Sequence, residues 1–199
     1  MTTRITLLCL PATSALRAGR FPADEPLDLE QAESIAGLAH VFSRSDQVLC
    51  SPARCAQHTA RALGLVPTIE PALREVNYGR WAGLSLKEVA VSEPLEIASW
   101  LSDPKLDSHG GESLNSAIER ISQWLEHYGW APGHTLIITH ASVIKAVILH
   151  VLRAPNQAYW QLDIAPLTQT ILSVHQDKWR LQSSGAPVPA GQPTRAIRP

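Results

Sequence analysis

The sequence predicts an α/β fold, a three-layer sandwich in which a mostly parallel central sheet carries helices on both faces. Two observations support this prediction. Short apolar runs typical of buried strands alternate along the chain with longer segments whose apolar residues recur at helical spacing. The 199 residues, 45% of them hydrophobic, are also enough to bury one sizeable core.

Local patterns define the elements of the first half. An apolar run at 4–8 predicts the first buried strand. Residues 29–42 have helical spacing after an acidic, proline-containing entry, and residues 48–50 predict a short strand. A helix over 54–63 is expected to end at Gly64, because glycine readily adopts the left-handed conformation found at helix ends.

The second half repeats the alternation. Residues 85–100 predict a helix with a break at Pro94. Residues 113–128 predict an amphipathic helix, because their apolar residues fall on one face, and Gly129 ends it. A strand at 134–139 and a helix at 142–152 follow.

We expect one domain over residues 1–182 and a flexible C-terminal tail over 183–199. The tail is rich in serine, glycine and proline, and this composition cannot bury enough apolar surface to offset the entropy of ordering.

Charge and cysteine content restrict the partners. The formal net charge is −1 with both signs interleaved, so nucleic-acid and membrane partners are not expected. The apolar stretch at 5–12 is too short for a membrane span and lacks a convincing processing site. Three cysteines without Cys-x-x-Cys spacing favour a reducing cytoplasm.

Several segments, in the same order, resemble the histidine phosphatase superfamily, also called phosphoglycerate mutase-like. The last two, at 168–174 and 178–181, resemble its closing strands. Among the earlier ones, residues 12–21 resemble the loop after the nucleophile, and residues 51–60 resemble a Ser-x-x-x-Arg-Ala-x-x-Thr-Ala element. Residues 73–84 resemble the segment of the proton donor. Residues 110–113 resemble a Gly-Glu-Ser helix start, and residues 135–141 resemble the strand before the second histidine.

The resemblance assigns positions to a site. Aligning on Thr13 and on Gly19-Arg20 places the family's Arg-His-Gly at three residues, Cys9, Leu10 and Pro11. The family's second phosphate-binding arginine falls on Cys55. The proton-donating carboxylate and the second histidine are intact at Glu75 and His140.

These replacements remove the chemistry that the resemblance implies. In the family the first histidine becomes phosphorylated and two arginines neutralise the phosphoryl oxygens. Leu10 has no lone pair, and loss of a nucleophile elsewhere costs roughly a millionfold in turnover. Cys9 and Cys55 carry no cation, and Pro11 deletes an amide donor. We therefore expect a pseudophosphatase rather than an ordinary phosphatase or mutase.

Two alternatives keep a chemical role for the thiols. Cys9 or Cys55 could act as a substitute nucleophile, or both could join Glu75 and His140 in binding zinc. We favour the simpler interpretation that both thiols are small buried hydrophobic groups, with no metal and no cofactor.

Other polar residues could line the pocket. Thr13, Ser14 and Ser142 could donate hydrogen bonds to a ligand, although Ser142 could equally cap the helix that it starts. Arg17 and Arg20 lie on the pocket loop and could bind a ligand.

Three functions remain open. The first, which we prefer, is a repurposed protein that binds a small metabolite or a partner protein through the altered pocket. The second is an enzyme that uses Glu75 and His140 for acid–base chemistry on a substrate with less negative charge than a phosphate ester. The third is a residual phosphomonoesterase with another nucleophile. Assembly into a homo-oligomer is compatible with all three.

Overall fold

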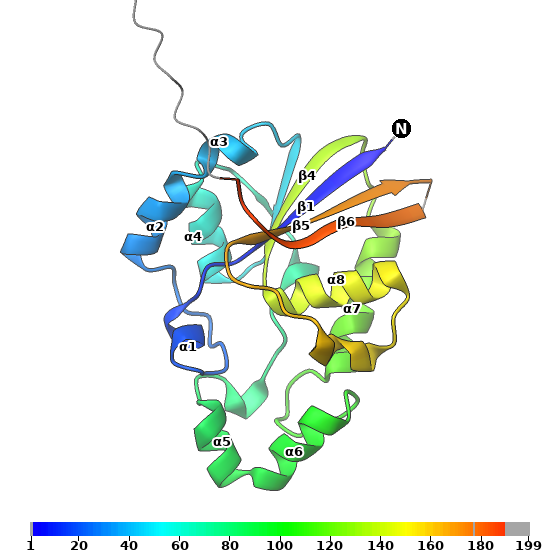
Figure 1. Ribbon diagram of the computed structural model, residues 1–199. Helices are drawn as coiled ribbons and strands as arrows, with labels where there is room; N and C mark the ends of the chain where they lie inside the picture. The colour runs from blue at the N-terminus through cyan, green and yellow to red at the C-terminus, as the bar shows by residue number, and fades with distance from the viewer. Residues whose placement is uncertain (1, 177, 190–199) are drawn as a thin grey trace, which may run out of the picture.

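The computed structural model describes residues 2–176 and 178–189, in which six strands form one sheet of order β3-β2-β4-β1-β5-β6. Strands β1 to β4 run parallel to one another, whereas β5 pairs antiparallel with both β1 and β6 (Figure 1). The predicted mostly parallel sheet is thus confirmed. The strands are β1 (Thr3–Cys9), β2 (Gln47–Cys50), β3 (Thr68–Ile69), β4 (Gly133–Thr139), β5 (Thr168–His175) and β6 (Lys178–Pro187).

Helices cover both faces of the sheet, α2 to α4 on one and α7 with α8 on the other, which confirms the three layers (Figure 1). Helices α5 and α6 lie beyond one edge of these layers. The helices are α1 (Ser14–Arg17), α2 (Leu29–Ala36), α3 (Ala39–Phe42), α4 (Arg54–Ala62), α5 (Leu86–Ser92), α6 (Pro94–Ser102), α7 (Leu114–His127) and α8 (Ala141–Leu152), with 3₁₀ turns η1 (Pro71–Leu73), η2 (Gly79–Trp81) and η3 (Asn156–Gln161).

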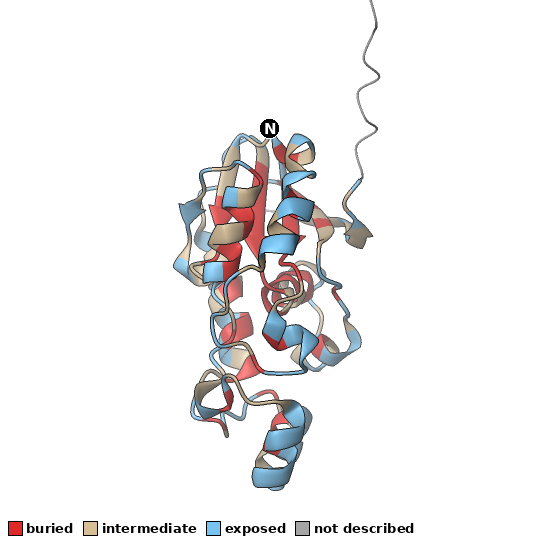
Figure 2. Ribbon diagram, turned by 90° about the vertical axis from the view of Figure 1, so that its left-hand side faces the viewer, coloured by how far each residue is buried: buried red, intermediate tan, exposed pale blue. Residues whose placement is uncertain are grey.

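The end of β1 divides its side chains between two cores. Because successive side chains of a strand point to opposite faces, Leu7 and Cys9 pack with α7 and α8, whereas Leu8 and Leu10 pack with α2 and α4. Figure 2 shows buried residues concentrated in the sheet and its covering helices. Cys9 and Leu10, which the resemblance assigns to the site, therefore pack in different cores.

A third, smaller core lies under α5 and α6. Phe21, Trp81 and Trp100 pack there with Val89 and Ile97. Ser85 and Glu88 form a reciprocal capping box that fixes the start of α5. The two short helices thus form a lid-like layer beside the carboxyl ends of the parallel strands (Figure 1).

Two boundaries differ from the sequence-based expectation, whereas the predicted break at Pro94 is confirmed as the junction of α5 and α6. The expected helix over 29–42 divides at Gly37 into α2 and α3. Strand β6 continues to Pro187, which pairs with Thr168, so residues 183–187 belong to the sheet rather than to a tail. The rest of the expected tail, from residue 190, lies outside the described residues.

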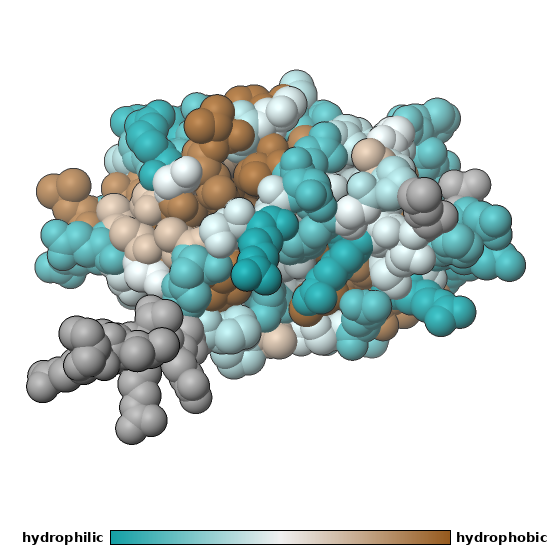
Figure 3. Space-filling model, turned by 90° about the horizontal axis from the view of Figure 1, so that it is seen from above, coloured by the Kyte–Doolittle hydropathy of each residue, from teal (hydrophilic) through white to brown (hydrophobic). Residues whose placement is uncertain are grey.

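On the side away from α5 and α6, polar residues cover most of the surface and apolar residues gather over one part of it (Figure 3). Among the described residues, no helix has the length and apolar character needed to cross a membrane.

Candidate functional site

The site forms where three parallel strands end. Cys9 closes β1, Ser51 follows β2, and His140 follows β4. The amide of Leu10 donates to the carbonyl of Thr139 at 2.9 Å, and that of Ser51 donates to Ile138 at 3.0 Å. Because the carboxyl ends of parallel strands meet at one edge, residues distant in sequence converge there, as in other open α/β sheets.

Glu75 and His140, which the resemblance assigns to one site, are in contact at this edge. The Oε2 atom of Glu75 lies 3.2 Å from Nδ1 of His140. The other carboxylate oxygen accepts hydrogen bonds from the hydroxyl of Ser142 and, at 2.8 Å, from the amide of Val76. Burial alone would raise the pKa of Glu75, but the attraction of His140 and these hydrogen bonds lower it below its usual value. Glu75 is therefore an ionised acceptor at neutral pH.

Ser51 completes the network and was missed by the sequence analysis. Its Oγ lies 2.8 Å from Nε2 of His140 and accepts a hydrogen bond from the amide of Ala53 at 3.2 Å. The ionised carboxylate of Glu75 is an acceptor only, so Nδ1 of His140 donates to it, and the Ser51 hydroxyl can either donate to or accept from Nε2. The available signal was position, because Ser51 directly follows a buried parallel strand.

A second layer of contacts holds the Glu75 loop. Arg120 forms an ion pair with Glu112 at 2.8 Å and donates to the carbonyl of Ala72. The amide of Glu112 donates to the carbonyl of Asn77 at 2.7 Å. The Gly-Glu-Ser segment therefore supports the loop that carries Glu75, and it does not line the cavity described next.

A cavity of about 370 Å³ opens over the Glu75–His140 pair. Its wall includes all five predicted positions in the altered motifs, Cys9, Leu10, Pro11, Thr13 and Cys55. Most of the other lining side chains are apolar, and the charged ones are the acids Asp24, Glu25 and Glu75. None of the lining residues is lysine or arginine. The cavity is thus apolar and locally acidic.

The altered positions behave as core residues. Leu10 is 7% exposed and packs in the same core as Cys55, while Cys9 packs in the other core. Burial raises the pKa of Cys9 to about 12 and that of Cys55 to about 11. Both thiols are thus protonated near neutral pH, which disfavours a nucleophilic role.

The zinc alternative has no structural support. Within the described residues, no group of three or more histidine, cysteine, aspartate or glutamate side chains could hold a metal ion.

Thr13, Ser14 and Ser142 differ in their placement. Thr13 lines the cavity, but its hydroxyl accepts from the amide of Leu16 at 3.2 Å and so caps α1. Ser14 is exposed and does not line the cavity. Ser142 is not a cap, because His140 occupies the N-cap position of α8, and its hydroxyl instead donates to Glu75.

Neither predicted arginine lines this cavity. Arg17 pairs with Asp28 and donates to the carbonyl of Ala12 at 2.6 Å. Arg20 pairs with Glu88 at 3.0 Å and donates to the carbonyl of Gly83 at 2.9 Å. Local acceptors therefore engage both guanidinium groups, and neither arginine contributes a cation to the lining of this cavity.

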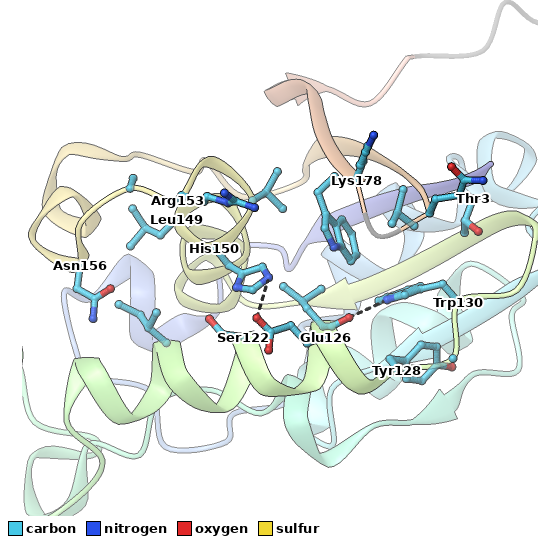
Figure 4. Close-up of a pocket in the computed structure, with 18 residues that line it drawn as sticks. Thr3, Ser122, Glu126, Tyr128, Trp130, Leu149, His150, Arg153, Asn156 and Lys178 are labelled. Carbon is cyan, nitrogen blue, oxygen red and sulfur yellow. Dashed lines mark hydrogen bonds and ion pairs between the residues drawn. The ribbon is translucent and has the colours of Figure 1, made fainter. Parts of the chain in front are cut away.

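A larger hollow of about 1100 Å³ lies between α7, α8 and the hairpin of β5 and β6 (Figure 4). It shares no lining residue with the cavity at Leu10. Across it, Nε2 of His150 lies 3.9 Å from Oε1 of Glu126, and the indole of Trp130 donates to the carbonyl of Leu125 at 2.9 Å. The Glu75–His140 pair does not line this hollow.

Comparison with known proteins gives an independent view of this arrangement. The family model described as histidine phosphatase superfamily (branch 1) matches residues 20–186. The match includes Glu75 and His140 and begins after the segment that contains Leu10.

Individual relatives agree with the family match. A bifunctional protein of Mycobacterium tuberculosis is 27% identical over 136 residues, which cover 65% of this chain but only 37% of that protein. The adenosylcobalamin/alpha-ribazole phosphatase of Escherichia coli is 25% identical over 159 residues, covering 74% of this chain and 76% of its own length.

A solved structure confirms the fold. The mycobacterial glucosyl-3-phosphoglycerate phosphatase matches with a TM-score of 0.79 at 22% identity, over 94% of this chain and all of that one. At this identity the likeness establishes the architecture alone.

Proposed function

Because the chain belongs to the histidine phosphatase superfamily, yet has Leu10 where the resemblance places the nucleophilic histidine, we propose that it no longer uses phosphohistidine chemistry and binds a small molecule in the cavity at Leu10. The observation that carries this proposal is that Leu10 is a buried core residue beside a cavity without any lining lysine or arginine.

The charge of the cavity supports a ligand other than a phosphate ester. Enzymes that transfer phosphoryl groups stabilise the oxygens with arginine, lysine or metal ions. Here Asp24, Glu25 and Glu75 are the lining charges, and each would repel a dianion. The part of the ligand that contacts Leu10 is therefore uncharged or cationic, and largely apolar.

Acid–base catalysis is a second candidate, favoured by the network around His140. Ser51, His140, Glu75 and Ser142 form a continuous chain of contacts that orients the imidazole. The Glu75–His140 pair can accept and return a proton in a hydrolytic, isomerising or eliminating step. The substrate would carry less negative charge than a phosphate ester, for the reason given above.

A residual phosphomonoesterase is the weakest candidate. It needs a thiolate at Cys9 or Cys55, and burial raises the pKa of both thiols far above neutrality.

A cytoplasmic location fits the three free, buried cysteines, since reducing compartments keep thiols unpaired.

A turnover assay tests these candidates together. The purified protein, Glu75→Gln and His140→Ala are incubated with a panel of phosphomonoesters and a matching panel of uncharged carboxylic esters. We expect no phosphate release above the buffer rate from any of the three proteins. Ester turnover lost in both variants would support the acid–base candidate, and phosphate release by the unaltered protein would contradict the proposal.

A further inference from the structure

A second cavity of about 400 Å³ adjoins the cavity at Leu10. The two share several lining residues, among them Glu75, Val76 and Tyr78, so the Glu75 loop forms a wall common to both. The two cavities therefore border each other at the carboxylate of Glu75. We call the second space the aromatic cavity, after its walls.

Aromatic rings from four separate segments line the aromatic cavity: Phe21, Tyr78, Trp100, Tyr159 and Trp160. The ring centres of Trp100 and Trp160 lie 5.1 Å apart with the rings edge to face, and those of Phe21 and Tyr78 lie 5.0 Å apart. Rings arranged in this way present both faces and edges, which are favourable contacts for a planar apolar group. The walls thus favour an aromatic portion of a ligand.

One cation faces this space without a strong partner. Lys145 lies one turn beyond Ala141 and Ser142 on α8, is half-buried, and has its ammonium 5.0 Å from the centre of the Tyr159 ring. Among residues 2–176 and 178–189, no carboxylate lies within 4.0 Å of it. Burial lowers the pKa of Lys145, an effect that Asp163 partly offsets. The ammonium has therefore lost part of its hydration without gaining an ion pair.

Arg20 also lines the aromatic cavity, but it is already engaged. Its guanidinium pairs with Glu88 and donates to the carbonyl of Gly83. Lys145 is consequently the cation available to a ligand.

We propose that the aromatic cavity binds an aryl carboxylate, with its ring among Tyr78, Trp100 and Trp160 and its carboxylate paired with Lys145. A singly charged carboxylate matches one available ammonium, whereas the nearby charge of Glu75 opposes a dianion such as a phosphate ester. This assignment rests on the proposed function, because the uncharged end of the same ligand would occupy the cavity at Leu10.

The test uses two probes that differ in charge and little else, 2-naphthoate and 2-naphthamide, titrated calorimetrically into the full-length protein. We expect the carboxylate to bind about tenfold more tightly, as one charge-assisted hydrogen bond allows. Lys145→Met should remove this preference by weakening the carboxylate far more than the amide, whereas Lys145→Arg should retain it. Lys178→Met, on the exposed surface of β6, is the matched control and should behave as the unaltered protein.

Three results would overturn the assignment: equal affinities of the two probes, a carboxylate preference that survives in Lys145→Met, or no binding of either probe at millimolar concentration. Circular dichroism verifies that each variant is folded. Release of phosphate from 2-naphthyl phosphate would instead contradict the loss of phosphatase chemistry, while a charge preference that depends on Lys145 would still stand. The two failures are therefore distinguishable.

Discussion

At the scale of single residues, the hydroxyl groups of Ser51 and Ser142 hold the acid–base pair in place. Glu75 and His140 could be assigned from the resemblance, because each stands in a recognisable local motif. Ser51 and Ser142 contact this pair from other segments, and only the folded chain brings their hydroxyls to it. Ser142 was expected to contact a ligand or to cap a helix, whereas its hydroxyl holds the carboxylate of Glu75.

The ionised state of Glu75 predicts a pH-dependent stability. Its pKa is lower in the folded protein than the value of 4.5 for the free side chain, so its contribution is complete above that pH and is lost as the pH falls through the folded pKa. Glu75→Gln should lower the free energy of unfolding by about 1–3 kcal/mol at pH 7. The difference from the unaltered protein should shrink below pH 4.5, as measured by urea denaturation.

Glu33→Gln provides the control, because Glu33 is exposed on α2. Its effect should be small at every pH. A destabilisation by Glu75→Gln that stayed constant into the acid range would show that the charge of Glu75 is not what stabilises the network.

At the scale of elements, the Glu75 loop is held where it crosses the loop that contains Gly111 and Glu112. Gly111 passes so close to the Glu75 loop that a Cβ atom on it would lie 2.0 Å from the carbonyl oxygen of Asn77 and 2.7 Å from the amide nitrogen of Gly79. Glu112 then binds Arg120, and Ser113 caps α7 by accepting from the amide of Ser116 at 3.1 Å. The segment predicted as a helix start therefore also fixes a neighbouring loop.

Gly111→Ala should accordingly destabilise the protein by about 1–3 kcal/mol, as overpacking does in other proteins. Gly129→Ala is the control, since a Cβ atom there meets no atom within 4 Å. Thermal unfolding of both variants measures the difference. Equal melting temperatures would mean that the two loops can separate freely and that the crossing does not position Glu75.

The element predictions succeeded where side-chain periodicity decides the structure. The apolar pattern predicted a helix over 113–128, and α7 begins and ends within one residue of these bounds. Ile118, Ile121 and Leu125 are buried on one face, as the pattern requires. The end of β6 could not be predicted in this way. Residues 183–187 are poor in large apolar side chains, yet they join the sheet through backbone pairing with β5, which composition does not report.

At the scale of the whole molecule, the order of the segments was enough to predict the architecture but not the cavity. The fold follows from strands and helices whose sequence signals are local. The character of the two adjoining cavities depends on acids from two loops, on apolar residues from several segments and on Lys145 of α8, which only the tertiary structure brings together. The fold alone therefore does not determine the chemistry of these cavities, as holds for many widely used folds.

The proposed loss of phosphohistidine chemistry depends above all on Leu10, Cys9 and Cys55, where the resemblance places the family's nucleophile and its two arginines. The most direct measurement compares phosphate release and covalent phosphate incorporation by the unaltered protein, by Leu10→His, and by the triple variant Leu10→His, Cys9→Arg, Cys55→Arg. Circular dichroism confirms that each is folded, because the arginines enter buried positions. We expect no phosphoenzyme in the unaltered protein. In the triple variant we expect phosphate on the histidine introduced at position 10 and measurable hydrolysis, with less from Leu10→His alone. A phosphoenzyme or robust hydrolysis in the unaltered protein would contradict the proposed loss of this chemistry.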